Sequence, residues 1–171
     1  MKTLAALVAT LLLTVASMTS HAAAPAPNRS VTYKSVDGVE LKMDVFEPLG
    51  IKPADRRPAI VFFFGGGWSG GSTRQFYQQA AAMAEQGMVA FSADYRVKSR
   101  NKTTPFECVK DGKSAIRWVR QHAAEFGIDP QRIVAAGGSA GGHVAACTGA
   151  IEGHDEAFHR VPQSTRHFEI N

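Results

Sequence analysis

An apolar segment that runs directly into a glycine-rich turn constrains the fold of this chain most strongly. Arg132–Ala136 (RIVAA) is an apolar stretch, the next residues read GGSAGG, and Gly142–Gly149 are mostly small. Such a tight passage brings backbone and Cβ atoms close together, and only small residues avoid clashes there. The segment therefore predicts a buried strand, a sharp turn at Ser139 and a helix.

Two further apolar runs precede this segment, and each leads into a stretch with helical periodicity. The apolar runs are Ala59–Phe64 and Met88–Ser92. The helical stretches are Ser72–Gln86 and the region from Val109 to Phe126, whose apolar residues recur at steps of three and four before Gly127. Apolar strands that alternate with helices predict a parallel sheet covered on both faces.

A hairpin is predicted ahead of these units. Ser30–Ser35 and Val39–Phe46 alternate in polarity on either side of Asp37-Gly38, a pair of residues typical of two-residue hairpin turns. We therefore expect an α/β fold: a mostly parallel sheet with an N-terminal antiparallel hairpin and helices on both faces. Asp129-Pro130 predicts a short turn before the last strand.

The first 24 residues have the pattern of a secretory signal peptide. Lys2 precedes an apolar run from Leu4 to Val15, and small residues end at Ala22–Ala24. The alternative is an uncleaved anchor, but the run is shorter than the ~20 residues that span a bilayer. We expect a signal peptide over 1–24, a leader over 25–29, and a secreted or periplasmic protein that leaves the membrane after cleavage.

Charge and cysteine content narrow the function classes. The formal net charge is +4, and the basic residues are scattered, so no basic stripe indicates nucleic-acid binding. The two cysteines, Cys108 and Cys147, both lie in helical stretches. They are interpreted as buried thiols, with a disulfide as the alternative that export would permit. Their spacing does not indicate a zinc site.

Ser139 is the candidate nucleophile. Gly137–Gly141 matches G-x-S-x-G, a short pattern that gains specificity when a strand precedes it and a helix follows it. The alternative is a phosphate-binding glycine turn. That reading is disfavoured because the turn at Gly137–Gly142 has neither the G-x-G-x-x-G spacing nor a G-K-[ST] sequence after it.

A second glycine-rich segment follows the first apolar run, with the sequence FFFGGGWSGGS over 62–72. Glycines at this position allow backbone N–H groups to point at a developing oxyanion. The candidate donors are Gly65, Gly66 and Gly67, with the N–H of Ala140 completing the oxyanion hole. The alternative is a flexible loop in which Trp68 is an ordinary packing residue.

Residues 31 to about 153 resemble the N-terminal half of the α/β-hydrolase fold. The resemblance is to secreted esterases and lipases with an HGGGW-type oxyanion loop and a GGSAGG nucleophile elbow. It is carried by VTYKSVDGVELKMDVFEP, AIVFFFGGGWSGGS, VAFSADYRV and CVKDGKSAIRWVRQHAAEFGIDPQRIVAAGGSAGGHVAA. It implies hydrolysis of small carboxylic esters, such as short-chain acyl esters or acetylated sugars, by a Ser-His-Asp/Glu triad without metal or cofactor.

The chain departs from that pattern in two places. Phe64 stands where the family's loop begins with histidine, so we expect a looser oxyanion hole. The triad acid and histidine of the family come from later strands, and 154–171 does not resemble them. We therefore expect 30–153 to be the N-terminal part of the domain and 154–171 a non-family tail, as in a truncated or frame-shifted product with weak or no activity.

Other titratable residues of the sequence are candidate triad partners. Asp155 followed by His159 or His167 has the required order, but these are interpreted as residues of a solvated tail. His143 is expected to contact the neighbouring loop or core, and His122 and Asp111 to lie on the surface. Asp94 is expected to be a structural carboxylate near Arg96.

Two rival functions remain open. A non-catalytic binding module of the same fold is favoured by Phe64 and by the missing triad partners, whereas no positive feature favours a serine peptidase. The fold also predicts that Arg132–Ala136 forms an exposed apolar edge, because the strands that would flank it are not recognised in the sequence.

Overall fold

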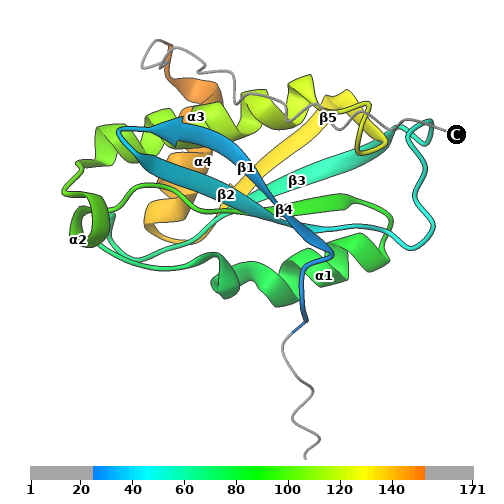
Figure 1. The fold of residues 1–171 in the computed structure, drawn as a ribbon, viewed down its shortest axis with the longest axis horizontal. Coiled ribbons are helices and arrows are strands. Elements are labelled where there is room, and N and C mark those ends of the chain that lie inside the picture. Colours follow the sequence, from blue (N-terminus) through cyan, green and yellow to red (C-terminus); the bar gives the residue numbers. More distant parts are fainter. Residues whose placement is uncertain (1–24, 153–171) are drawn as a thin grey trace, which may run out of the picture.

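A computed structural model describes residues 25–152 as a five-stranded sheet with helices on both faces. The strands are β1 (Arg29–Val36), β2 (Val39–Phe46), β3 (Arg57–Phe63), β4 (Val89–Ala93) and β5 (Ile128–Gly137). Their order is β1-β2-β4-β3-β5; β2 is antiparallel to β1 and β4, and β3 is parallel to β4 and β5 (Figure 1). The predicted α/β fold with an N-terminal antiparallel hairpin is confirmed.

The hairpin turn forms at the predicted residues. Asp37 and Gly38 both have positive φ angles, 51° and 75°, as a two-residue turn that matches the twist of the strands requires. Asp37 tolerates this conformation better than most side chains do. Val36 pairs with Val39 directly across the turn, and the register of β1 on β2 shifts once, between Thr32 and Lys34.

Helices cover both faces of the sheet. The helical segments are η1 (Thr73–Phe76), α1 (Tyr77–Glu85), α2 (Lys98–Asn101), α3 (Pro105–Gln121) and α4 (Ala140–Ala150). Figure 1 shows α1 on one side of the sheet and α3 and α4 on the other. None of the helices in the described range is long and apolar enough to cross a membrane.

The core is divided by the sheet into two apolar clusters. Along β3, Val61 and Phe63 belong to the cluster under α3 and α4, whereas Phe62 belongs to the cluster under α1. Side chains of a strand alternate between its faces, so a strand between two helical layers must be apolar throughout. This is why the continuous apolar runs in the sequence predicted central strands.

Some boundaries differ from the predictions. The stretch 72–86 begins with the 3₁₀ turn η1 and becomes α-helical at Tyr77. Helix α3 ends at Gln121, and 122–127 form turns, so Gly127 does not terminate the helix. Gly127 has a φ of 62°, and a Cβ there would collide with the carbonyl of Lys52. It therefore shapes the entry to β5.

Strand β5 is longer than predicted. It begins at Ile128, so Asp129-Pro130 lies within the strand rather than in a separate turn. The pairing with β3 shifts between Arg57 and Ala59, and this irregularity accommodates the proline. Within the described residues β5 is an edge strand, and Val134 is 49% exposed. The apolar edge expected from the sequence is therefore present in this part of the chain.

Candidate active site

Ser139 occupies the turn between β5 and α4. Its φ and ψ are 51° and −121°, a strained backbone conformation for a residue that is not glycine. The side chain is exposed, and the residue directly precedes the first turn of an 11-residue helix. The positive end of the helix dipole favours negative charge at this position. The strand–turn–helix geometry predicted for a nucleophilic serine is thus in place.

Glycines permit the close contacts that form this turn. A Cβ on Gly137 would lie 2.5 Å from the carbonyl oxygen of Gly141 and 2.6 Å from that of Phe63. A Cβ on Gly141 would overlap the Phe63 carbonyl and approach the Phe64 oxygen to 2.5 Å. The end of β3, the turn and the start of α4 are therefore packed backbone against backbone.

The glycine-rich loop after β3 lies against the same turn. A Cβ on Gly65 would lie 2.8 Å from the Gly138 carbonyl oxygen and 3.4 Å from the Cβ of Ser139. The N–H of Gly65 donates to Oε1 of Gln75 at 2.5 Å, so this predicted oxyanion donor is engaged within the protein. Sequence spacing gave no signal for Gln75, because an amide side chain that fixes a loop has no characteristic pattern.

The other three predicted donors are differently placed. Gly66 and Gly67 are exposed, with φ angles of 140° and 60°, and Ala140 is the first residue of α4. Among residues 25–152, no hydrogen-bond acceptor is recorded for the N–H groups of Gly66, Gly67 and Ala140. A first-turn N–H such as that of Ala140 has no partner within its own helix. These groups are therefore the ones that remain for a ligand.

Phe64 is held by packing where the family resemblance places a histidine. Its ring is fully buried and stacks on Tyr95, with centroids 4.2 Å apart and planes 13° apart. The hydroxyl of Tyr95 donates to the Phe64 carbonyl at 2.6 Å, and burial raises the pKa of Tyr95. A Cβ on Gly71 would collide with the Phe64 ring, so the glycine allows the loop to pack against it. The stacked rings and the Tyr95 hydrogen bond therefore secure the base of the loop, although Phe64 stands where the family has a histidine.

His143 faces the loop, as expected, and is not positioned as a base. Its ring meets Trp68 edge to face, with centroids 5.4 Å apart, and its Nε2 lies 3.5 Å from the Sγ of Cys147. The only recorded hydrogen bond to Ser139 in the described range runs from the backbone N–H of His143 to the serine carbonyl, at 3.1 Å. Cys108 and Cys147 are both buried, unpaired thiols.

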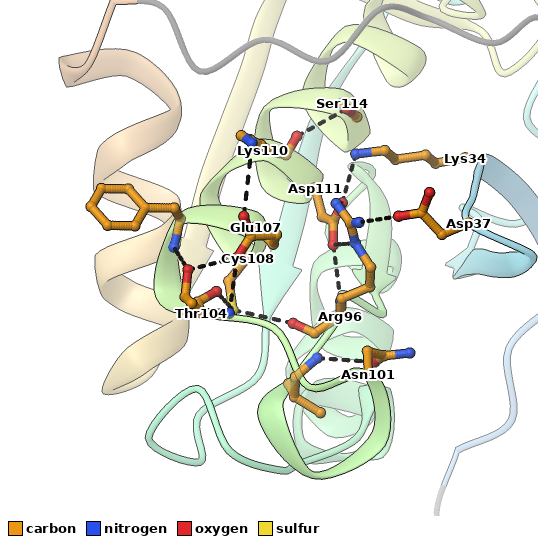
Figure 2. A network of polar contacts seen from close by, with 12 residues as sticks. Lys34, Asp37, Arg96, Asn101, Thr104, Glu107, Cys108, Lys110, Asp111 and Ser114 are labelled. Atoms are coloured by element: carbon orange, nitrogen blue, oxygen red, sulfur yellow. Dashed lines mark hydrogen bonds and ion pairs between the residues drawn. The ribbon is translucent and has the colours of Figure 1, made fainter.

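Asp111 was predicted to lie on the surface, and that prediction is wrong. The side chain has no exposed area. Its carboxylate accepts two hydrogen bonds of 2.9 Å from Arg96, one from Nε and one from Nη2 (Figure 2). Lys34 Nζ lies 2.6 Å from the same carboxylate. Asp37 approaches Arg96 at 3.6 Å from the exposed side. The network joins the hairpin, the segment after β4 and α3.

Asp94 is a structural carboxylate, as expected, but its partner is not Arg96. Arg100 binds it with two nitrogen–oxygen distances of 2.6 and 2.9 Å. The backbone carbonyl of Asp94 also accepts a hydrogen bond of 2.7 Å from the buried hydroxyl of Tyr33. Burial, with the nearby carboxylate of Asp111 adding to it, raises the pKa of Tyr33. Among residues 25–152, neither carboxylate is hydrogen-bonded to a histidine.

The remaining candidates are not brought to Ser139. His122, partly buried rather than on the surface, stacks on Trp118 with centroids 4.0 Å apart, and its Nδ1 lies 2.8 Å from the Trp118 carbonyl oxygen. Asp155, His159 and His167 lie outside the described residues. The residues that the structure does describe contain no group of three or more metal-ligating side chains.

Comparison with known proteins connects this geometry to esterases. A structure of esterase 2 from Thermogutta terrifontis with bound propionate is 62% identical, with a TM-score of 0.69 over 70% of this chain and 44% of that one. Its apo form is 57% identical, with a TM-score of 0.75 over 78% of this chain and 49% of that one. Esterase LipQ of Mycobacterium tuberculosis is 35% identical over 78% of this chain.

The comparisons also define how much of these proteins the chain represents. It covers 33% of LipQ and 25% of a probable isoprenylcysteine alpha-carbonyl methylesterase of Arabidopsis thaliana, to which it is 32% identical. The model of the BD-FAE family matches residues 43–171, which includes the segment predicted to be a non-family tail. This match spans most of the sequence, and the chain therefore belongs to the BD-FAE family, a family of α/β-hydrolase esterases.

Proposed function

We propose that this chain carries the nucleophile and oxyanion-binding part of a carboxylic ester hydrolase, with Ser139 as the nucleophile. One observation carries the proposal: Ser139 has a strained backbone at the start of α4, and the glycine loop packs against it at Gly65. A strained, exposed serine beside unpaired backbone N–H groups is the arrangement that acyl transfer requires.

In this mechanism the Oγ of Ser139 attacks the ester carbonyl carbon and loses its proton to a base. The carbonyl oxygen becomes an oxyanion, which the N–H groups of Gly66, Gly67 and Ala140 stabilise. The alcohol leaves with a proton from the same base, and water then hydrolyses the acyl-enzyme. The base and its acid are proposed to come from segments outside residues 25–152, since no described histidine reaches Ser139.

The proposed substrates are small esters with short acyl chains. The structures of T. terrifontis esterase 2 include propionate-bound and butyrate-bound forms, and this supports a small acyl group here. Acetylated carbohydrates are the wider class that we propose for the alcohol side. Residues 1–24, which have the pattern of a signal peptide, support a secreted or periplasmic location.

A non-catalytic binding module is the second candidate. It is favoured by one observation: within the described range neither a carboxylate nor a histidine side chain is hydrogen-bonded to Ser139. A serine without a base is a weak nucleophile. The same site would then bind an ester or an acid without turning it over.

Covalent labelling distinguishes the two candidates. The purified chain is treated with paraoxon, which phosphorylated T. terrifontis esterase 2, and the adduct is located by mass spectrometry. The esterase proposal predicts an adduct on Ser139 that Ser139→Ala abolishes and that Ser30→Ala, a change at an exposed serine of β1, leaves intact. A folded chain that gives no adduct at Ser139 would show that these 171 residues supply no base to the serine, as the binding module predicts.

A further inference from the structure

A cavity lies beside the oxyanion loop and is not used by the mechanism above. Its volume is about 510 Å³, and its walls come from the loop Gly67–Ser69 and from the segment Lys98–Pro105. Two backbone hydrogen bonds join these walls: Lys98 N–H to the Trp68 carbonyl at 2.9 Å and Ser99 N–H to the Ser69 carbonyl at 3.0 Å. The cavity is therefore built into the fold rather than left between independent loops.

Positive charge borders the cavity. Lys98 and Lys102 lie four residues apart on α2 and its C-terminal cap, and both are exposed. The lysine C-cap has a φ of 56°, and its N–H donates to the Lys98 carbonyl at 2.9 Å, which fixes its position relative to α2. Among the described residues, neither ammonium group has a recorded ion pair.

The carboxylates nearest in sequence are already engaged. Asp94 is held by Arg100. Glu107 accepts from the backbone N–H of Thr104 at 2.9 Å, and its other oxygen lies 3.8 Å from Lys110. Within residues 25–152, the two lysines at the cavity therefore present to an incoming anion positive charge that no ion pair compensates.

The cavity has apolar wall surface, and two of its lining residues carry buried polar atoms without a hydrogen-bond partner among the described residues. Trp68 and Pro105 supply apolar surface. The Nε1 of Trp68 and the Oγ1 of Thr103 are buried and have no hydrogen-bond partner among the described residues. Buried polar atoms without partners are uncommon and costly. Both side chains line the cavity, and a turn of the Thr103 side chain would offer its hydroxyl to an acceptor oxygen there.

We propose that this cavity binds a carboxylate carried on an apolar or aromatic body, as the part of the ester substrate that lies away from the scissile carbonyl. The proposal rests on the proposed function for the position of the ester at Ser139. Gly67 is at once a wall of the cavity and a candidate oxyanion donor, so a substrate held at Ser139 has the cavity next to it. The apolar body packs on Trp68 and Pro105, and the lysines attract the carboxylate.

Binding is tested without turnover by NMR of the two tryptophan indole N–H groups, which Trp118→Phe assigns. Titration with benzoate is expected to shift the Trp68 signal in a saturable way, whereas benzamide, its neutral counterpart of the same shape, leaves it in place. Equal shifts with both would overturn the role of charge. Equal competition by inorganic phosphate would overturn the preference for an apolar carboxylate.

The lysines are tested by a charge-matched pair of variants. Lys98→Gln with Lys102→Gln is expected to weaken benzoate binding roughly three- to tenfold, the effect of losing two exposed charge contacts. Lys42→Gln with Lys52→Gln removes the same charge at two exposed positions away from the cavity and is expected to have no such effect. Equal weakening in both variants would overturn the assignment.

The outcome is separable from that of the proposed function. A chain that binds benzoate at Trp68 but is not phosphorylated at Ser139 would support the cavity proposal and contradict the esterase proposal. A chain that is phosphorylated at Ser139 but shows no benzoate-dependent shift of the Trp68 signal would support the esterase proposal and contradict the cavity proposal.

Discussion

Arg96 and Asp111 form a two-point ion pair in the interior of the protein, with Nε and Nη2 each 2.9 Å from a carboxylate oxygen. The backbone N–H of Arg96 donates to the same carboxylate at 3.0 Å, and Lys34 approaches it at 2.6 Å. Because these residues belong to the segment after β4, to α3 and to β1, the carboxylate fixes three parts of the chain to one another. The segment after β4 continues into the wall of the cavity beside the oxyanion loop.

Replacing Asp111 with asparagine is expected to lower the free energy of unfolding by about 3–5 kcal/mol, because it removes the buried carboxylate charge to which both Arg96 and Lys34 bind. Urea denaturation of the wild-type and variant chains measures this difference. Glu40→Gln is the control, since Glu40 pairs with Lys42 at 3.7 Å on the surface and should change stability by less than about 1 kcal/mol. Equal effects of the two substitutions would contradict the buried network.

Cys108 should make the protein lose stability at alkaline pH. Burial, reinforced by the nearby carboxylate of Asp111, raises the pKa of the Cys108 thiol from 9.0 to about 12. Folding therefore favours the protonated thiol, so its contribution is fully present below pH 9 and is lost as the pH rises toward 12. We expect the stability of the wild-type chain to fall more steeply over this range than that of Cys108→Ala.

The comparison with Cys108→Ala isolates this thiol, because the buried Tyr33 and Tyr95, whose pKa values are also raised, are present in both proteins. Urea denaturation at a series of pH values provides the measurement. In a Cys147→Ser background, iodoacetamide should alkylate Cys108 slowly at pH 8.5 in the native state and rapidly in urea. Rapid native alkylation would show that the thiol is accessible.

The elbow was predictable from sequence because the small residues that it requires follow one another in the chain. The contacts of Gly137 and Gly141 with neighbouring backbone exclude larger side chains. In the sequence this restriction appears as a run of small residues after a strand. The hairpin was predictable for the same reason, since Asp37 and Gly38 together adopt positive φ angles. The hairpin turn depends on residues adjacent in the chain, whereas the elbow also packs against the end of β3 at Phe63, which the run of small residues does not identify.

The interactions that were missed join residues far apart in the chain. Asp111 lies on the buried face of α3, between Cys108 and Ala115, and that spacing of three and four carried a signal for burial. Its partner Lys34 is 77 residues away, and no sequence pattern indicates such a pairing. The contact of Gln75 with Gly65 spans ten residues and likewise depends on how η1 packs against the loop.

Gly141→Ala is expected to disrupt the elbow, because the added Cβ would overlap the Phe63 carbonyl. Overpacking of this kind costs about 1–3 kcal/mol and would move Ser139 relative to the glycine loop. Gly149→Ala is the matched control on the same helix, since nothing lies within 4 Å of its added Cβ, and it should stabilise the chain by about 0.5–1 kcal/mol. Thermal unfolding of both variants measures the contrast, and a neutral Gly141→Ala would contradict the packing described here.

Gln75 is expected to influence the reactivity of Ser139 without contacting a substrate. Its amide oxygen accepts the Gly65 N–H at 2.5 Å, and Gly65 lies against the Ser139 turn, so Gln75→Ala would release the loop that carries Gly66 and Gly67. Loss of one such hydrogen bond, worth about 0.5–1.5 kcal/mol, should slow paraoxon labelling of Ser139 roughly two- to tenfold. Gln75→Glu keeps an acceptor at this position and should restore most of the rate, whereas Gln78→Ala, at an exposed position of α1, should leave it unchanged. Equal rates for Gln75→Ala and the wild type would mean that the loop holds its shape without this contact.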